Sequence, residues 1–172
     1  MNKLLGVLTA LAVISGGGLA AAQNVDPTLA DRTGVYVGGT LGTTTDDASR
    51  ITAGAVVGYQ AHRNLRLEGT YDNVWNTSRN GSVLMLNVVP QYRVPNSTLT
   101  VYGVAGAGLG WDNYGRVGSG DAAAVYNVGA GVRIAVIHSE ELVARARYVA
   151  PVTAENGAQD AVLLTLGAAY RF

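Results

Sequence analysis

Five charged side chains are the residues of this chain best placed for electrostatic chemistry. They are Arg66, Glu68, Arg133, Arg145 and Arg147, and each lies in a segment where polar and apolar residues alternate. Alternation puts such residues on one face of extended strands, opposite an apolar face. Glu68, Arg133 and Arg145 each lie about four residues from the same kind of strand end, so we expect them at one depth. Arg66 should lie nearer that end and Arg147 farther from it.

These charges predict a structural ionic plug in the interior of a closed sheet. A planar guanidinium can hold a carboxylate by two parallel hydrogen bonds, so we expect Glu68 to contact Arg133 or Arg145. One acid against several arginines leaves a positive surplus. That surplus needs carbonyls, tyrosine hydroxyls, water or an anion, because an unpaired buried charge is expensive. A gated or proton-conducting lumen is the alternative use of the same residues.

A possible hydrolase trio, His138, Ser139 and Glu140, occurs at one predicted turn. Adjacent residues in a tight turn do not line up as nucleophile, base and orienting acid. We therefore predict a solvated turn at this position and no catalytic residue.

Two glycine-rich stretches, 106–110 and 129–131, carry no nucleotide motif. A dinucleotide fingerprint needs its glycines between a strand and a helix, whereas these glycines lie inside predicted strands. A P-loop needs a lysine, and Lys3 is the only lysine of the chain. His62 and His138 are far apart in sequence and lack further ligands, so we predict no metal site and no cofactor.

The composition excludes several classes of protein. The chain has 172 residues, a single-domain length, and no cysteine, so a disulfide framework and thiolate chemistry are excluded. Lys3 is the only lysine, and the remaining 11 basic residues are arginines facing 12 acidic residues. This near-neutral balance contains no basic tract, and we predict no nucleic-acid partner.

The N-terminus has the pattern of a secretory signal peptide. Lys3 supplies a positive start, residues 4–14 form an apolar run, and small residues lead to Ala22. The run is too short for a membrane-spanning helix of ~20 residues. We predict a signal peptide over residues 1–22 with cleavage after Ala22, and a short extension over residues 23–32.

The rest of the chain alternates with a period of two residues and predicts eight strands. Globular strands usually have ~5–6 residues, whereas a tilted membrane-crossing strand needs ~9–11. The predicted strands have 10 to 15 residues, which favours a membrane. They cover residues 34–43, 50–60, 64–74, 82–92, 98–111, 123–137, 141–151 and 161–172.

Short and long connections alternate between these strands, as in outer-membrane barrels. An even number of strands puts both ends of the barrel segment on the short-turn side. Aromatic residues gather near the strand ends, which is typical of interfacial girdles. The short turns are 61–63, 94–97 and 138–140, and the longer loops are 44–49, 74–81, 112–122 and 152–160.

The last strand resembles the terminal strand of bacterial outer-membrane barrels. The match consists of Leu164, Leu166, Ala168, Tyr170 and Phe172, a final aromatic residue preceded by apolar residues at alternate positions. In that family this pattern is recognised by the barrel assembly machinery. The glycine-rich predicted strands at 98–111 and 123–137 are similar to small OmpA-like, OmpX-like and opacity-protein-like barrels.

The resemblance implies an all-β fold, an eight-stranded antiparallel up-and-down transmembrane β-barrel over residues 33–172. It implies export to the bacterial outer membrane, lipid as the surroundings, and the assembly machinery as a partner during insertion. Neighbouring envelope proteins are possible further partners. We expect the chain to differ from OmpA by ending at the barrel, without a periplasmic peptidoglycan-binding domain. We expect a structural role in envelope integrity or surface interactions, with short outer loops and no enzymatic activity.

Three other readings differ in what they require of the barrel. A narrow or gated pore needs a continuous water path, and a lipid-modifying enzyme needs a polar trio at the outer rim. A soluble lipocalin-like barrel should carry apolar residues inside and charge outside, the reverse of this pattern. In predicted strand 98–111 the lipid face stays ambiguous between Tyr102 with Val104 and Val101 with Leu109. Elsewhere we expect these residues to face lipid: Val57, Leu67, Leu86, Val128, Leu164 and Leu166.

Overall fold

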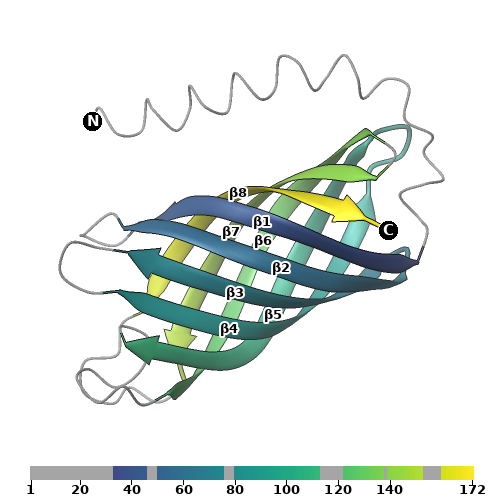
Figure 1. The fold of residues 1–172 in the computed structure, drawn as a ribbon. Coiled ribbons are helices and arrows are strands. Elements are labelled where there is room, and N and C mark those ends of the chain that lie inside the picture. Colours follow the sequence, from purple (N-terminus) through teal and green to yellow (C-terminus); the bar gives the residue numbers. More distant parts are fainter. Residues whose placement is uncertain (1–32, 46–49, 76–79, 113–121, 138, 153–159) are drawn as a thin grey trace.

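The chain folds into one closed barrel of eight antiparallel strands (Figure 1). The computed structural model describes residues 33–45, 50–75, 80–112, 122–137, 139–152 and 160–172. Each strand pairs with its sequence neighbours, and the first strand pairs with the last. The strands are β1 (Gly34–Thr44), β2 (Ile51–His62), β3 (Leu65–Trp75), β4 (Gly81–Arg93), β5 (Leu99–Asp112), β6 (Ala123–Ile137), β7 (Glu140–Pro151) and β8 (Ala161–Arg171).

The predicted eight-stranded antiparallel barrel is therefore confirmed, with strand ends shifted by at most two residues. The largest shift is at the first short turn, because β2 continues to His62 through a register irregularity after Gln60. Glu140, predicted as a turn residue, belongs to β7 and pairs with Tyr170 of β8. The predicted signal peptide and extension lie outside the described residues. Within the described residues, no helix is long and apolar enough to cross a membrane.

The two ends of the barrel differ in their connections. The C-terminus and the three short turns lie at one end, on the right in Figure 1, which we call the short-turn end. The strand ends that flank the four longer connections lie at the other end, the long-loop end. Each end therefore gathers strand ends that are far apart in the sequence.

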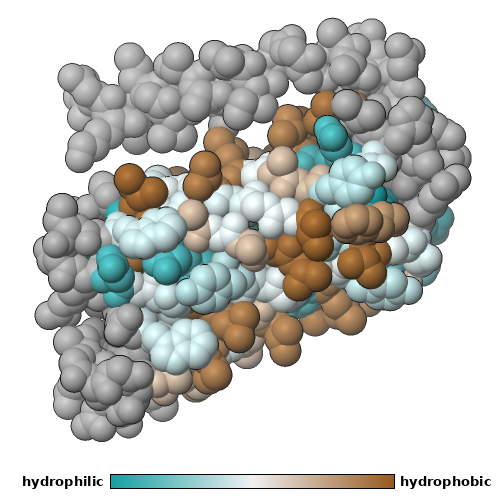
Figure 2. All heavy atoms as spheres, in the orientation of Figure 1, coloured by the Kyte–Doolittle hydropathy of each residue, from teal (hydrophilic) through white to brown (hydrophobic). Residues whose placement is uncertain are grey.

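The outer wall of the barrel is apolar, as the alternation predicts. Leu86 is 75% exposed and Val128 is 53% exposed. Leu166 is half-buried, on the same outward side as Leu164. On the face shown in Figure 2, hydrophobic residues gather on the middle and right of the wall. All the residues predicted to face lipid point outward, and these are Val57, Leu67, Leu86, Val128, Leu164 and Leu166.

Strand β5, the ambiguous case, presents Val101 and Leu109 to the outside and buries Tyr102 and Val104. Its inward side is otherwise formed by small residues, which leaves room in the lumen for Tyr102. Tyr102 pairs across the strands with Gly131, where an added Cβ would overlap the Tyr102 ring. The glycine therefore lets a large ring lie flat against the neighbouring strand.

The larger apolar core of the interior lies toward the long-loop end, and a smaller cluster of Val89, Tyr102 and Val104 lies nearer the short-turn end. Seven inward side chains from β3, β4, β6, β7 and β8 pack in the larger core with exposed fractions from 0% to 7%. We call this group the apolar seal. Its members are Val74, Val83, Met85, Val125, Val149, Ala161 and Leu163.

Candidate functional site: the charged lumen

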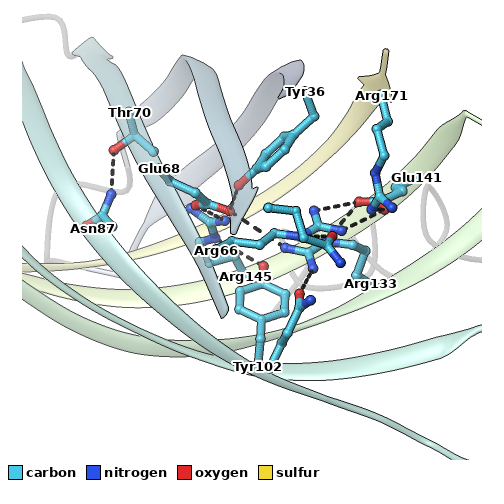
Figure 3. A network of polar contacts seen from close by, with 12 residues as sticks. Tyr36, Arg66, Glu68, Thr70, Asn87, Tyr102, Arg133, Glu141, Arg145 and Arg171 are labelled. Carbon is cyan, nitrogen blue, oxygen red and sulfur yellow. Dashed lines mark hydrogen bonds and ion pairs between the residues drawn. The ribbon is translucent and has the colours of Figure 1, made fainter. Parts of the chain in front are cut away.

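Glu68 is the centre of a buried ionic network between the apolar seal and the short-turn end (Figure 3). Its carboxylate accepts a hydrogen bond of 2.6 Å from the Tyr36 hydroxyl at Oε1 and one of 2.6 Å from Arg145 Nη2 at Oε2. Arg133 Nη2 lies 3.6 Å from Oε1. The contacts predicted for Glu68 are thus present with both arginines, and Arg145 makes the shorter one.

Backbone register explains how Tyr36 reaches this acid. On three adjacent strands, Tyr36 pairs with Gly58, and Gly58 pairs with Glu68. A Cβ on Gly58 would overlap the Tyr36 ring, so the glycine lets the ring cross β2 and place its hydroxyl against the carboxylate. The glycine is therefore required by a close approach, not by backbone conformation.

The opposite side of the lumen repeats this arrangement with the charge reversed. Tyr102 pairs with Gly131, and Gly131 pairs with Arg145. The Arg145 Nε donates to the Tyr102 hydroxyl at 3.1 Å. Glu68 and Arg145 therefore occupy equivalent places on the two sides and meet each other across the lumen at 2.6 Å.

Glu141 forms a second centre nearer the short-turn end. Arg66 donates to it through two bonds, Nη1 to Oε2 at 2.9 Å and Nη2 to Oε1 at 2.8 Å. Arg133 Nε lies 3.1 Å from Oε2, and Arg171 Nη2 contacts Oε1. Two parallel hydrogen bonds from one planar guanidinium to one carboxylate are the geometry that arginine favours in ion pairs.

Arg147 pairs with Asp72 at the side of the network that faces the apolar seal. The Arg147 Nη2 donates to Asp72 Oδ2 at 2.8 Å, and Nη1 donates to Thr70 at 3.3 Å. The Asn87 amide also donates to Thr70 at 3.3 Å. A neutral polar layer thus lies beside this ion pair.

The prediction of one acid against several arginines is wrong, because Glu141 and Asp72 also face the lumen. Both lie at inward positions of the alternation, Glu141 at the first residue of the predicted strand 141–151 and Asp72 four residues beyond Glu68. Arg171, at the inward position before the final residue, was also missing from the predicted cluster. Even so, five arginines of the network share three carboxylates, and a sixth, Arg50, is buried at the long-loop end.

Two tyrosine rings stabilise part of this positive charge. The Arg66 guanidinium lies 4.7 Å from the centre of the Tyr36 ring. Arg133 and Arg145 lie 4.7 Å and 5.3 Å from the centre of the Tyr102 ring. Cations above aromatic faces gain about 2 kcal/mol or more when desolvated. The rings therefore supplement the carboxylates where acids are too few.

Little free space remains among these side chains. A hollow of about 20 Å³ lies between Tyr36, Glu68, Asp72 and Arg147. A second hollow of about 10 Å³ opens at the short-turn end beside Arg133. A water molecule needs about 10–15 Å³ of such space, so each hollow holds one or two waters at most.

The described residues offer little for catalysis or metal binding. No group of three or more His, Asp and Glu side chains converges among them. His138 of the possible hydrolase trio lies outside the described residues. The Ser139 carbonyl accepts the Arg171 backbone N–H at 2.7 Å, and Glu140 is exposed at the start of β7. What the network can do chemically is hold charge and bind an anion.

The C-terminal residues lie on the outer face at the seam between β8 and β1. Phe172 is 76% exposed, and its ring packs edge-on against Tyr170 with 5.2 Å between centroids. Its backbone N–H donates to the Val35 carbonyl at 3.0 Å. The backbone of the last residue is therefore fixed, while its side chain stays available on the outside.

Aromatic side chains form two belts on the outer wall, one near each end of the barrel. Tyr126 and Tyr148 pack edge-on at 6.4 Å near the long-loop end, and Tyr71 donates to Ser82 nearby. The belt near the short-turn end contains Tyr59, Tyr92, Tyr170 and Phe172, and the belt near the long-loop end contains Tyr71, Trp75, Trp111, Tyr126 and Tyr148.

Solved structures to which this chain is similar include small outer-membrane barrels. Neisserial surface protein A superposes with a TM-score of 0.65 at 17% identity over 81% of this chain and 97% of that one. The N-terminal β-barrel domain of Pseudomonas aeruginosa OprF gives 0.63 at 16% identity, over 82% and 100% of the two chains. The outer-membrane enzyme PagL gives 0.54 at 13% identity, over 80% and 99%. No family model and no curated protein sequence matches the chain.

The chain therefore has the fold of small eight-stranded outer-membrane β-barrels. At these identities the similarity describes the fold alone, since one fold hosts many functions. The role of the chain has to be argued from its wall, its lumen and its rims.

Proposed function

We propose that this protein is an integral outer-membrane barrel with a structural role, exported by a cleaved signal peptide and closed inside by its own side chains. The observation that carries the proposal is the double closure of the lumen, by the apolar seal and by the ionic network. Such a barrel contributes to envelope integrity or presents short loops to neighbouring envelope proteins.

The outer wall supports placement in a membrane. Apolar residues face outward between two aromatic belts, and the charged side chains of the wall face the lumen. A closed sheet leaves no unpaired backbone edge, which hydrocarbon would penalise heavily. A soluble lipocalin-like barrel needs the opposite distribution, so this wall favours lipid.

The lumen supports a closed barrel over a pore. Ions would have to pass Glu68 with its arginines and then the apolar seal, whose members are at most 7% exposed. A barrel of eight strands has an interior that side chains can fill. The narrow or gated pore is therefore the weaker proposal.

The long-loop rim supports a role without catalysis. PagL, which shares the fold, is an outer-membrane enzyme. At this rim, the polar contacts among the described residues include the Tyr148 hydroxyl donating to Asp160 at 2.8 Å, Tyr71 donating to Ser82 at 3.1 Å, and the Arg50 backbone N–H donating to the Thr44 hydroxyl at 3.0 Å. None of these contacts joins a nucleophile to a histidine base, the pairing on which acyl transfer depends.

The C-terminal residues complete the proposal. Leu164, Leu166, Ala168, Tyr170 and Phe172 alternate along the outer face of β8, where a recognition partner can reach them. We assign this row as the signal read by the barrel assembly machinery during insertion.

A liposome-swelling assay tests the structural role. Vesicles containing the purified, folded protein should swell in small sugars and amino acids no faster than protein-free vesicles, whereas a general porin should produce fast swelling. Swelling above the protein-free rate would replace the structural role by transport. If the same protein released fatty acid from lipid, the proposed structural role would be replaced by an enzymatic one.

A further inference from the structure

The short-turn end of the lumen has a feature that a structural plug does not need. The hollow there is lined by Arg63 from the β2–β3 turn, Arg93 from the end of β4, and the buried Arg66 and Arg133. Glu141 is the carboxylate in this lining. Four guanidinium groups thus face a space that opens toward solvent.

The carboxylate is already engaged by other contacts. Glu141 receives two hydrogen bonds from Arg66, lies 3.1 Å from Arg133 Nε, and contacts Arg171, which is outside the lining of the hollow. Glu68, the next acid inward, is held by Arg145 at 2.6 Å. The mouth therefore keeps a positive surplus, and its low-dielectric walls strengthen the field of that charge.

The buried arginines and the turn beside them are held in place before any ligand arrives, and Arg93 donates to the Ser97 carbonyl through Nε at 3.3 Å and Nη2 at 3.4 Å. Gln91 accepts from Arg133 Nη1 at 2.7 Å and donates through its amide to the Arg63 carbonyl at 2.7 Å. This side chain ties the β2–β3 turn to the buried arginine. Arg66 and Arg133 are 2% and 3% exposed, so the surrounding residues fix their positions.

The donors match a tetrahedral oxyanion. Guanidinium forks pair with phosphate oxygens through parallel hydrogen bonds, and Thr98 and Thr100 line the same hollow. The hollow is about 10 Å³, so it admits only the tip of an anion while the rest stays at the rim. That size selects a single phosphate group over a nucleotide base or a sugar.

We propose that the short-turn mouth is a binding site for a phosphate group, with Arg63 and Arg93 as the outer ligands and Arg133 as the inner one. The apolar seal makes the site single-ended, so the anion enters and leaves by the short-turn side. The phosphate belongs either to a free ion or to a lipid headgroup at this rim. The site goes beyond the structural role and does not depend on it.

Nuclear magnetic resonance of the folded protein in octyl glucoside, a detergent without phosphate, tests the site. Titration with inorganic phosphate should produce saturable shifts in the signals of Gln91, Thr98 and Thr100, and none at Val125 in the apolar seal. Sodium chloride at the same ionic strength should not reproduce them. Equal shifts with chloride would mean screening only and would overturn the proposal.

Two exposed or half-exposed ligands allow substitution without opening the core. Arg63→Gln and Arg93→Gln should each weaken phosphate binding about tenfold, the factor for one charge-assisted hydrogen bond of ~1.4 kcal/mol. Glu140→Gln, at the same rim, removes a negative charge and should leave the affinity unchanged or raise it. Wild-type affinity in the Arg63→Gln, Arg93→Gln double variant, with folding confirmed by its heat-dependent gel mobility, would also overturn the proposal.

Bilayer nanodiscs of phosphatidylglycerol distinguish the two sources of phosphate. If a headgroup occupies the site, the Gln91 and Thr100 signals should already lie at their phosphate-bound positions and free phosphate should not move them. If the site takes a free ion, the titration should proceed as in detergent. Signals at the unbound positions that free phosphate does not move would contradict both sources.

Discussion

The two ends of the lumen are filled by different kinds of side chain. The long-loop end is filled by Val74, Leu163 and their apolar neighbours, which need only contact and exclusion of water. The short-turn half is filled by charges, where Glu141 and Glu68 must each satisfy two or more arginines. The difference teaches that apolar filling tolerates small errors of shape, whereas ionic filling fails when a single partner is lost.

Removing the central acid should have the largest effect on folding. Glu68→Ala leaves Arg145, Arg133 and the Tyr36 hydroxyl without their carboxylate. Breaking a buried pair costs ~3–5 kcal/mol, less where lumen water enters. The free energy of unfolding from urea titrations in vesicles should fall by that order. Glu140→Ala, an exposed acid on β7, is the control, and equal midpoints for the two variants would remove the basis for the ionic plug.

An apolar truncation at the other end should cost less. Leu163→Ala removes a fully buried side chain from the apolar seal and should destabilise the barrel by roughly 3 kcal/mol. Leu164→Ala, the adjacent lipid-facing residue, should cost much less in the same urea titration, because lipid fills the vacated space. A larger loss at Leu164 than at Leu163 would show that the inside and outside of β8 are exchanged.

Substituting Tyr36 and Tyr102 separately compares the stability that each side of the charged lumen contributes. Tyr36→Phe removes a bond of 2.6 Å to a carboxylate, whereas Tyr102→Phe removes a bond of 3.1 Å from Arg145. Hydrogen bonds to charged groups contribute ~1.5–3 kcal/mol, so Tyr36→Phe should destabilise by about 2 kcal/mol. Tyr102→Phe should cost less, because its ring keeps both arginine contacts. Thermal unfolding of the pair measures the order, and the reverse order would contradict it.

The smallest effect on folding itself should come from the C-terminal residue. Phe172 is 76% exposed, so deleting it should hardly change the midpoint of refolding in detergent. In cells the same deletion should strongly reduce the amount recovered in the outer membrane, because it removes part of the proposed assembly signal. Equal losses in both assays would assign Phe172 to packing alone.

The period-two pattern was sufficient to predict the strands and the facing of all of them except β5, which stayed ambiguous between two sets of residues. Alternation from Leu65 to Trp75 predicted that Arg66 and Glu68 face inward, and the structure agrees. Alternation reports which face a residue occupies, so the contact of Glu68 with Arg145 also required an estimate of depth. Counted from the predicted starts at 64 and 141, both residues lie four positions along strands that start at the same end. The observed strands start at Leu65 and Glu140, one residue away in opposite directions, and the two side chains still meet.

The rest of the site depends on features that alternation does not carry. Glu141 and Arg171 lie at strand ends, where a boundary error of one residue turns a lumen residue into a turn residue. The Tyr36 contact depends on the stagger between β1, β2 and β3, which brings Gly58 beneath the ring. Stagger is a property of the closed barrel, and no single strand encodes it.

Conductance across a planar bilayer tests the central claim, the closure of the lumen, most directly. The folded wild-type protein should give no current steps over the bare bilayer at low and high salt, because the ionic network and the apolar seal block the path in series. Glu68→Ala should also remain closed, since the apolar seal is intact, and Glu68→Ala combined with Leu163→Ala should be the first variant to conduct. Regular current steps from the wild-type protein would contradict the closed lumen.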